Sequence, residues 1–304
     1  MNALLAPLAL SIGGLLAVQA AANLQLSTAL GSPVRASTAQ LAIGTAALIA
    51  LAAAVGTLGA LGAVPAAAPW HLVGGLGSAI YITAGILLFP RLGALGAVGL
   101  FITGQMLASL AVDGLGLLGV AREGFPPAHV LGGVAVLGGA AAIVRASRTD
   151  RPVAHRRALQ AFAVAAGVAL AIQGPINAQL RADLDAPVTA GAFSFLVATA
   201  TMIAVLAVWQ RRPRPPRPGL HARAMPWWGW LGGLVGATYV TVVPLLIGEI
   251  GAAATIGLTV AGQQLVSLTV DRYGLLRLPR RPLTLLRTTG VALLLAGVAL
   301  IQFA

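Results

Sequence analysis

The chain has 304 residues, of which 58% are hydrophobic and only 9% are charged, with a formal net charge of +12. Soluble domains carry roughly a quarter charged residues, so this composition predicts an integral membrane protein. Cysteine is absent, which excludes disulfides, thiolate catalysis and Cys-ligated metals. All of the positive charge comes from arginines that lie between apolar segments. That placement is typical of loops that orient a membrane protein, and it argues against nucleic-acid binding.

Ten apolar segments follow one another along the chain, each long enough to match the hydrocarbon core of a bilayer. The predicted transmembrane helices lie near 4–27, 36–58, 69–89, 92–112, 127–145, 158–181, 188–209, 227–248, 251–270 and 284–303. The one obvious linker is the Arg/Pro-rich segment 211–219, whose prolines prevent helix formation and whose charges favour water.

An internal repeat is the strongest signal in the sequence. The segment 104–113, GQMLASLAVD, recurs 158 residues later as GQQLVSLTVD at 262–271. Its Gln, Ser and Asp are each four residues apart, so they form one polar stripe on an apolar helix. Other polar, glycine and aromatic positions recur 154 or 158 residues apart. They include Gln19 and Gln173, Asn23 and Asn177, Pro33 and Pro187, Trp70 and Trp228, Tyr81 and Tyr239, and Gly132 and Gly290.

The two halves of the repeat, residues 1–150 and 151–304, each contain five predicted spans. Five is an odd number, so the second half must start on the opposite side of the membrane. The expected fold is therefore an all-α membrane protein built from two inverted five-helix repeats. Of the 19 arginines, only Arg122 and Arg181 fall outside the loops that follow odd-numbered spans. The positive-inside rule then makes those loops cytoplasmic and puts both termini outside a multi-pass cytoplasmic-membrane protein.

Polar side chains within the spans are the candidate substrate-binding residues, because a polar group in hydrocarbon turns toward the protein interior or a water-filled cavity. Their depths predict two layers related by the repeat. The cytoplasmic layer contains Gln19, Asn23, Gln263 and Ser267, and the outer layer contains Gln173, Asn177, Gln105 and Ser109. Tyr81 and Tyr239 lie deep enough that their hydroxyls need a partner or a cavity. Two interpretations stay open: the layers line a central cavity, or they only bond helices together at about 0.6 kcal/mol per bond.

Asp113 and Asp271 end the two polar stripes and are candidates for coupling or gating. Asp271 directly precedes Arg272, so a loop ion pair or a solvated helix end is the simpler interpretation. A proton-coupling role would need a buried carboxylate. Glu249 is expected to be an exposed turn residue, and Asp183 is expected to lie in solution.

Enzyme signatures are missing from the sequence. The four histidines have no metal-ligand spacing, no carboxylates are paired at one depth for acid–base work, and no phosphate-binding loop occurs. The sequence therefore predicts no catalytic residue, no metal and no cofactor.

Several motifs together resemble one family. They are the Gln…Asn stripe of the first span, the Gly-Ser-Pro turn at 31–33, Pro69-Trp70, and the Gly-Gln-x-x-x-Ser-x-x-x-Asp stripe with the following Gly-Leu-Leu and Arg-Arg-Pro. In these features the chain is similar to the YdcZ-type family of the drug/metabolite transporter superfamily, over nearly its whole length. The resemblance implies a fused ten-span form of proteins whose five-span members pair antiparallel. The first half departs from the pattern at Arg122-Glu123. Related small multidrug-resistance proteins use a glutamate in span one, where this chain has amides, which argues against lipophilic cations as cargo.

The internal repeat, the two polar layers and the family resemblance favour a secondary transporter, either an exporter or a facilitator. It would move a small polar metabolite or drug by alternating access between the two halves. The alternative is a non-transporting membrane scaffold or subunit, or a lipid-handling protein. A polar, water-filled cavity would favour the first, and a dry interface with a lipid-facing groove the second. The expected partners are a small-molecule substrate and membrane lipids, and a homodimer is compatible with the sequence.

Overall fold

The computed structural model describes residues 4–92, 94–122, 124–146, 155–211, 225–277, 280 and 284–303, and over these residues the chain is helical, without a strand. The linker predicted at 211–219, apart from Arg211, lies outside the described residues, as do Glu123 and the predicted repeat boundary at 150/151. The α-helices are α1 (Leu5–Leu30), α2 (Pro33–Ala54), α3 (Gly75–Leu92), α4 (Ala94–Leu115), α5 (Pro127–Ala146), α6 (Arg156–Leu184), α7 (Pro187–Gln210), α8 (Gly232–Ile250), α9 (Ala252–Tyr273) and α10 (Leu285–Phe303). Short 3-10 turns are η1 (Leu58–Ala66), η2 (Pro69–Val73), η4 (Trp227–Trp230) and η5 (Leu275–Arg277).

The boundary between α1 and α2 follows the turn chemistry of its sequence. Gly31 ends α1 in the left-handed conformation, with φ of 61°. The hydroxyl oxygen of Ser32 then caps α2 by accepting a hydrogen bond from the backbone N–H of Arg35 at 3.4 Å, and Pro33 occupies the first turn. A proline costs nothing there because the first N–H groups of a helix have no intrahelical partner.

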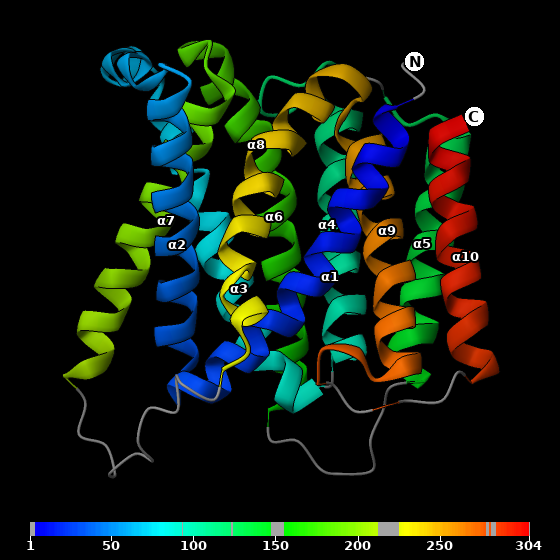
Figure 1. Ribbon diagram of the computed structural model, residues 1–304. Coiled ribbons are helices and arrows are strands. Elements are labelled where there is room, and N and C mark those ends of the chain that lie inside the picture. Colours follow the sequence, from blue (N-terminus) through cyan, green and yellow to red (C-terminus); the bar gives the residue numbers. More distant parts are fainter. Residues whose placement is uncertain are drawn as a thin grey trace.

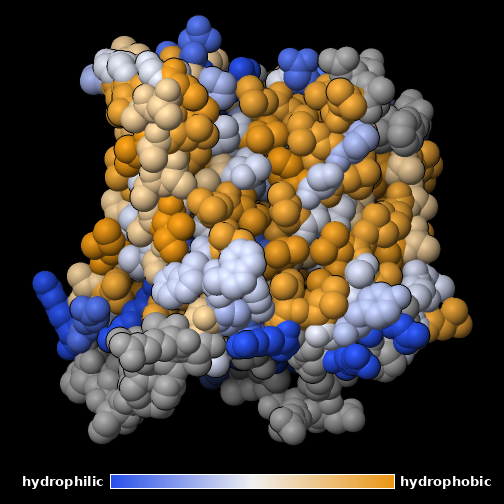
Figure 2. Space-filling view, viewed as in Figure 1, coloured by the Kyte–Doolittle hydropathy of each residue, from blue (hydrophilic) through white to orange (hydrophobic). Residues whose placement is uncertain are grey.

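Eight helices in the described part of the chain, α1 to α8, are long and apolar enough to cross a membrane. For α3 and α8 the apolar stretch also takes in η2 and η4, and α10 is a shorter apolar helix over Leu285–Ile301. Figure 2 shows hydrophobic side chains across most of the middle of the visible face, with hydrophilic residues concentrated toward its two ends. The chain is therefore a multi-pass membrane protein.

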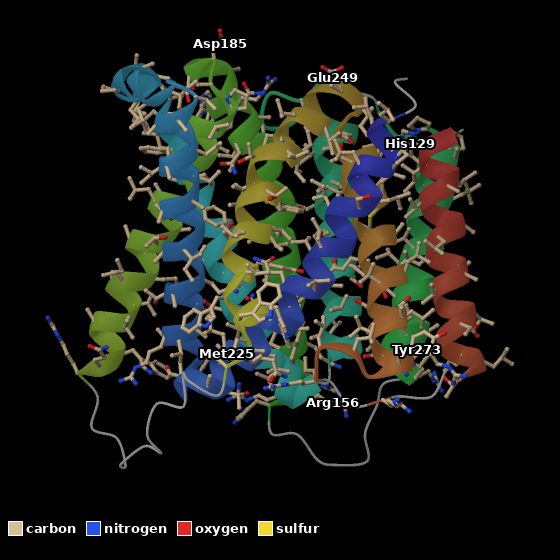
Figure 3. All side chains as sticks on the ribbon, viewed as in Figure 1. His129, Arg156, Asp185, Met225, Glu249 and Tyr273 are labelled. Carbon is tan, nitrogen blue, oxygen red and sulfur yellow. The ribbon has the colours of Figure 1, made fainter. Side chains whose placement is uncertain are left out.

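The helices stand side by side and alternate in direction (Figure 1). The start of α1 and the end of α10 lie on the same side of the bundle. In Figure 3, Asp185 and Glu249, which follow α6 and end α8, lie on that side, whereas Arg156, Met225 and Tyr273 lie on the opposite side. Helix α6 therefore runs opposite to its repeat counterpart α1.

The largest helix contacts join the two halves of the chain. Helix α1 packs on α9, α4 on α6, α2 on α7, and α5 on α10. Because α6 is the repeat counterpart of α1 and α9 that of α4, the first two contacts are equivalent. The α2–α7 contact joins equivalent residues directly, since Thr45 and Thr199, which are 154 apart, share a hydrogen bond of 2.8 Å. Both halves thus belong to one bundle.

Glycines bring the backbones of α1 and α9, and of α4 and α6, into direct contact. A Cβ atom added to Gly13 would lie 1.8 Å from the carbonyl oxygen of Thr259, and one on Gly262 would lie 1.9 Å from that of Leu10. The equivalent positions Gly167 and Gly104 would each place a Cβ 2.0 Å from a carbonyl oxygen of the facing helix. Small residues of this kind allow close packing between helices in a membrane, where apolar burial alone gives little association.

We predict that Gly13→Ala destabilises the fold, because the added methyl group must separate α1 from α9, and overpacking of this kind costs about 1–3 kcal/mol. The measurement is thermal unfolding of the purified protein in detergent, followed by tryptophan fluorescence. The control is Gly85→Ala on α3, where the added Cβ would have no neighbour closer than 4.0 Å. Equal melting temperatures for the two variants would refute the packing role of Gly13.

Candidate substrate-binding site

The amide side chains of α1 and α6 are buried, as expected for polar groups on membrane helices. Gln19 and Asn23 are 3% and 5% exposed, and Gln173 and Asn177 are each 2% exposed. Each pair lies one turn apart on its helix, so both members face the same neighbours.

A first group, the α1 cluster, consists of Gln19, Asn23 and Gln40, which surround Gly232 at the start of α8. The Nε2 atom of Gln19 donates to the carbonyl oxygen of Gly232 at 3.0 Å. A Cβ atom on Gly232 would lie 2.0 Å from Nε2 of Gln40 and 2.9 Å from Oδ1 of Asn23, so only glycine leaves room for these amides. Within the described part of the chain, Oδ1 of Asn23 and both amide atoms of Gln40 have no hydrogen-bond partner.

The second group, the α6 cluster, consists of Gln173, Asn177, Ser78 and Ser194. Gln173 and Ser78 exchange hydrogen bonds of 2.8 and 3.0 Å. Asn177 lies against Gly74, where a Cβ atom would be 2.2 Å from its Oδ1. Both amide atoms of Asn177 and the hydroxyl of Ser194 lack partners among the residues that the structure describes.

The two clusters occupy equivalent places in the repeat but differ in detail. Gln40 and Ser194 are separated by the same 154 residues as the paired amides. Ser78, which holds Gln173, corresponds to Gly236, which has no hydroxyl for Gln19. Gln19 therefore bonds to the backbone of Gly232 instead.

The polar stripes of α4 and α9 are unequal as well. Gln263 donates from Nε2 to the hydroxyl of Tyr81 at 3.1 Å, which links α9 to α3. At the equivalent positions, Nε2 of Gln105 and the hydroxyl of Tyr239 are both buried without a partner among the described residues. Both tyrosines pack in one apolar cluster with Leu16 and Leu170.

The serines of these stripes do not join either cluster. Ser109 is buried and donates to the carbonyl oxygen of Met106 in its own helix at 3.2 Å, and Ser267 is only half-buried. Several buried polar residues, by contrast, were absent from the predicted layers, among them Gln40, Ser78, Ser194 and Gln264. Gln40 and Ser194 could have been found from their repeat spacing. Gln264 corresponds to Met106, so the repeat gave no signal for it.

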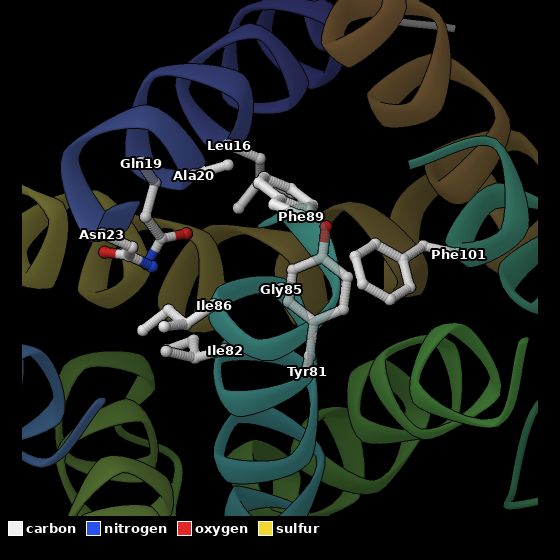
Figure 4. Close-up of a pocket in the computed structure, with 10 residues that line it drawn as sticks. All are labelled: Leu16, Gln19, Ala20, Asn23, Tyr81, Ile82, Gly85, Ile86, Phe89 and Phe101. Carbon is white, nitrogen blue, oxygen red and sulfur yellow. The ribbon is translucent and has the colours of Figure 1, made fainter. Parts of the chain in front are cut away.

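A pocket of about 290 Å³, the α1 pocket, opens beside the α1 cluster. It is lined by Leu16, Gln19, Ala20 and Asn23 of α1, Tyr81, Ile82, Gly85, Ile86 and Phe89 of α3, and Phe101 of α4. Figure 4 shows the Gln19 and Asn23 amides and the Tyr81 ring projecting between α1 and α3. A mostly apolar wall with a few converging polar groups is the usual character of a small-molecule site.

A second pocket of about 160 Å³, the α6 pocket, lies beside the α6 cluster. Its walls are Asn177 and Arg181 of α6, Pro187, Ala190 and Gly191 of α7, and Val240, Thr241 and Pro244 of α8. Asn177, Val240 and Pro244 are the repeat counterparts of Asn23, Ile82 and Ile86, which line the α1 pocket. The two pockets therefore share three equivalent positions, but the α1 pocket extends toward α4 and the α6 pocket toward α7.

The difference in pocket size has a cause in the sequence. Gly85 of the α1 pocket corresponds to Val243, and Phe89 corresponds to Ile247. In the second half these branched side chains lie close to Gly174, with the nearest Ile247 and Val243 atoms 2.5 and 3.7 Å from the place where its Cβ atom would be. They fill space that Gly85 leaves open in the first half.

The predictions for two acidic residues need correction. Asp113 and Asp271 are buried, at 3% and 7% exposure, and are not solvated helix ends. Asp271 forms an ion pair with Arg287 of α10, not with Arg272, which is exposed. Helix α9 continues past Asp271 to Tyr273, so Asp271 stays on the face that α10 covers.

Asp183 is exposed, as expected, and it also pairs with Nδ1 of His71 in η2. Glu249 is exposed, as expected. Within the described ranges, no group of three or more His, Asp or Glu side chains is placed to hold a metal ion.

These features define a class: a multi-pass helical membrane protein whose buried amides border pockets within the apolar bundle. The family model described as "Putative inner membrane exporter, YdcZ", of the drug/metabolite transporter type, matches residues 4–142 and 158–300. The chain belongs to this family. Membership supports membrane transport in general, and each half of the chain matches the family model separately.

The fold is also found among solved structures. One, described only as "Crystal structure of protein", has a TM-score of 0.57 and 20% sequence identity, over 98% of this chain and 94% of that chain. At this identity the similarity shows the fold alone. No curated protein matches the chain.

We predict that Asp271→Asn strongly destabilises the protein, because it leaves the buried Arg287 guanidinium without its carboxylate. Breaking a buried ion pair from one side costs about 3–5 kcal/mol. Arg272→Gln, at the exposed neighbouring position, should leave the melting temperature unchanged. The double variant Asp271→Asn/Arg287→Gln should recover part of the loss, as a double-mutant cycle would measure. An equal loss of melting temperature in Asp271→Asn and Arg272→Gln would refute the stabilising role of the Asp271–Arg287 ion pair.

Proposed function

We propose that the protein is a secondary transporter that moves a small polar molecule across the cytoplasmic membrane by alternating access. The observation that carries the proposal is a pair of pockets beside the repeat-equivalent residues Asn23 and Asn177, one of about 290 Å³ and one of about 160 Å³. Unequal states of equivalent sites are what a carrier with one side open and the other closed requires.

The unpaired amides support a polar cargo. Leaving a buried donor or acceptor unsatisfied costs about 1–3 kcal/mol, so such groups are rare unless they serve a purpose. Asn23 at the α1 pocket and Asn177 at the α6 pocket carry unpaired atoms within the described residues, as does Gln40 of the α1 cluster. A polar cargo would satisfy them in turn as it passes. This favours transport over a scaffold or lipid-handling role, for which apolar walls would suffice.

The helix contacts suggest how access would alternate. Contacts α1–α9 and α4–α6 are equivalent, as are the unequal pairs Gln263–Tyr81 and Gln105–Tyr239. In our proposal the halves exchange conformations: the Gln105–Tyr239 bond forms, the Gln263–Tyr81 bond breaks, and the α6 pocket enlarges as the α1 pocket closes. The ten helices then act as two inverted five-helix repeats, 1–150 and 151–304.

We further propose that all ten helices cross the membrane and that both termini lie outside. Because the chain has no cysteine, single-cysteine variants can be labelled without background. Ala66→Cys in η1 should react with a membrane-impermeant maleimide on intact cells, and Thr284→Cys before α10 should react only after the membrane is opened. Both positions are exposed. Labelling of both from the same side would contradict this topology.

The function itself is tested by a thermal-shift screen of the purified protein against a library of metabolites and drugs, followed by counterflow of each radiolabelled hit in proteoliposomes. We predict that Asn23→Ala and Asn177→Ala each reduce counterflow by on the order of tenfold, the worth of one good hydrogen bond to the cargo. The control is Thr255→Val, which removes a buried hydroxyl bonded only within α9, to Gly251 at 2.7 Å. Hits whose counterflow survives both asparagine substitutions would contradict the proposal.

A further inference from the structure

Arg181 is a cation placed at the wall of the α6 pocket. It lies one turn after Asn177 on α6, so the two residues share one helix face, and both line the pocket. The arginine is half-buried, and its Nε atom is buried without a hydrogen-bond partner among the described residues. Its Nη2 atom lies near the end of α8, 3.5 Å from where a Cβ atom on Gly248 would be.

The carboxylates nearest in the fold are otherwise engaged or exposed. Asp183 is paired with His71. Asp185 and Glu249 are exposed at the end of the bundle, where Figure 3 shows them at its edge. Across the described ranges, the ion pairs are His71–Asp183 and Asp271–Arg287, and neither includes Arg181. Arg181 therefore brings to the pocket wall a charge that has no ion-pair partner among the described residues, which is costly near hydrocarbon.

The neighbouring amide completes a binding geometry for an anion. Both side-chain atoms of Asn177 are unpaired in the described part of the chain, although the residue is only 2% exposed. A guanidinium offers a planar fork of donors and no acceptor, which matches the two oxygens of a carboxylate. The Nδ2 atom of Asn177 has no partner among the described residues and is a second donor for the same ligand, whereas its Oδ1 atom lies against Gly74.

This cation belongs to one half of the repeat only. The counterpart of Arg181 is Ser27, so the α1 pocket has the equivalent amide, Asn23, without a charge beside it. A cargo held at both pockets would thus be bound by its anionic group at the α6 pocket and released to a neutral site at the α1 pocket.

We infer that Arg181 and Asn177 form a carboxylate-binding subsite and that the cargo is a small molecule carrying a carboxylate. The inference rests on the proposed transport function and specifies its substrate class. The α6 pocket is narrow in this structure, which favours a compact acid or zwitterion.

The test is the thermal stability of the purified protein in a nonionic detergent, at constant ionic strength, with pairs of molecules that differ only in charge. The probes are acetate and acetamide, benzoate and benzamide, and succinate and succinamide. We expect at least one acid to raise the melting temperature in a concentration-dependent manner, and its amide not to. Arg181→Gln should weaken the apparent affinity for that acid by on the order of tenfold or more, because it removes a charge-assisted hydrogen bond.

Two further variants separate recognition from folding. Arg181→Lys keeps the charge but loses the fork, and should retain weakened binding. Asn177→Asp supplies an internal carboxylate, and should abolish the effect of the acid while the protein stays folded. Arg91→Gln, an exposed arginine whose Nη1 bonds to the Leu87 carbonyl, is the matched control and should respond like the wild type.

Three results would overturn the inference: an acid that stabilises Arg181→Gln as well as wild type, amides that stabilise as well as their acids, or no effect of any acid on the wild type. Stabilisation by phosphatidylglycerol alone would assign the subsite to a lipid headgroup and would also overturn it. If a neutral cargo is transported and its counterflow needs Asn23 and Asn177 but not Arg181, the proposed transport function is supported. The inference that the cargo carries a carboxylate is then refuted.

Discussion

In the hydrocarbon core, the hydrogen-bond partners of a polar side chain must come from the protein itself. Both pockets of this structure lie beside buried amides that lack such partners among the described residues. Gln19, Gln173 and Gln263 are held by a backbone carbonyl, a serine and a tyrosine. Asn23, Asn177 and Gln40 keep unpaired atoms in the described part of the chain, and the two asparagines line the two pockets. We propose that these unpaired groups serve the cargo, because each costs free energy when it is left without a partner.

The internal duplication determines where these residues lie in the bundle. Equivalent glycines bring α1 onto α9 and α4 onto α6, so the same interface occurs twice with opposite orientation. Small differences then make the halves unequal. In the repeat, Gly85 corresponds to Val243, Ser78 to Gly236 and Ser27 to Arg181. In a perfectly symmetric bundle, the two conformations would have equal free energy and the two pockets would carry the same charge. These substitutions bias the conformation, and Arg181 gives the two pockets different charge.

The sequence was sufficient to predict the helices and the burial of their amide side chains. Helix positions and the burial of Gln19, Asn23, Gln173 and Asn177 follow from apolar length and from the cost of polar groups in lipid. Partners could not be predicted, because they depend on which helix covers a side chain. Asp271, next to Arg272, was interpreted as a loop ion pair or a solvated helix end, yet α10 brings Arg287 over it.

Isolated polar residues and pocket sizes escaped prediction for related reasons. Gln40 and Ser194 are single polar residues among apolar neighbours, and only their shared spacing marked them. Pocket size depends on how Val243 and Ile247 fill the space near Gly174, which is a property of packing in three dimensions. The two repeats as separate units, 1–150 and 151–304, remain a prediction.

The central claim, that the two pockets open in alternation, is tested most directly by distances between spin labels on the cysteine-free chain. One pair, Thr28→Cys with Arg91→Cys, spans the ends of α1 and α3, and the repeat-equivalent pair, Ala182→Cys with Glu249→Cys, spans the ends of α6 and α8; all four positions are exposed. Measured by double electron–electron resonance in lipid nanodiscs, with and without a bound ligand, the first distance should shorten under the conditions in which the second lengthens. Two distances that change together, or that never change, would contradict alternating access.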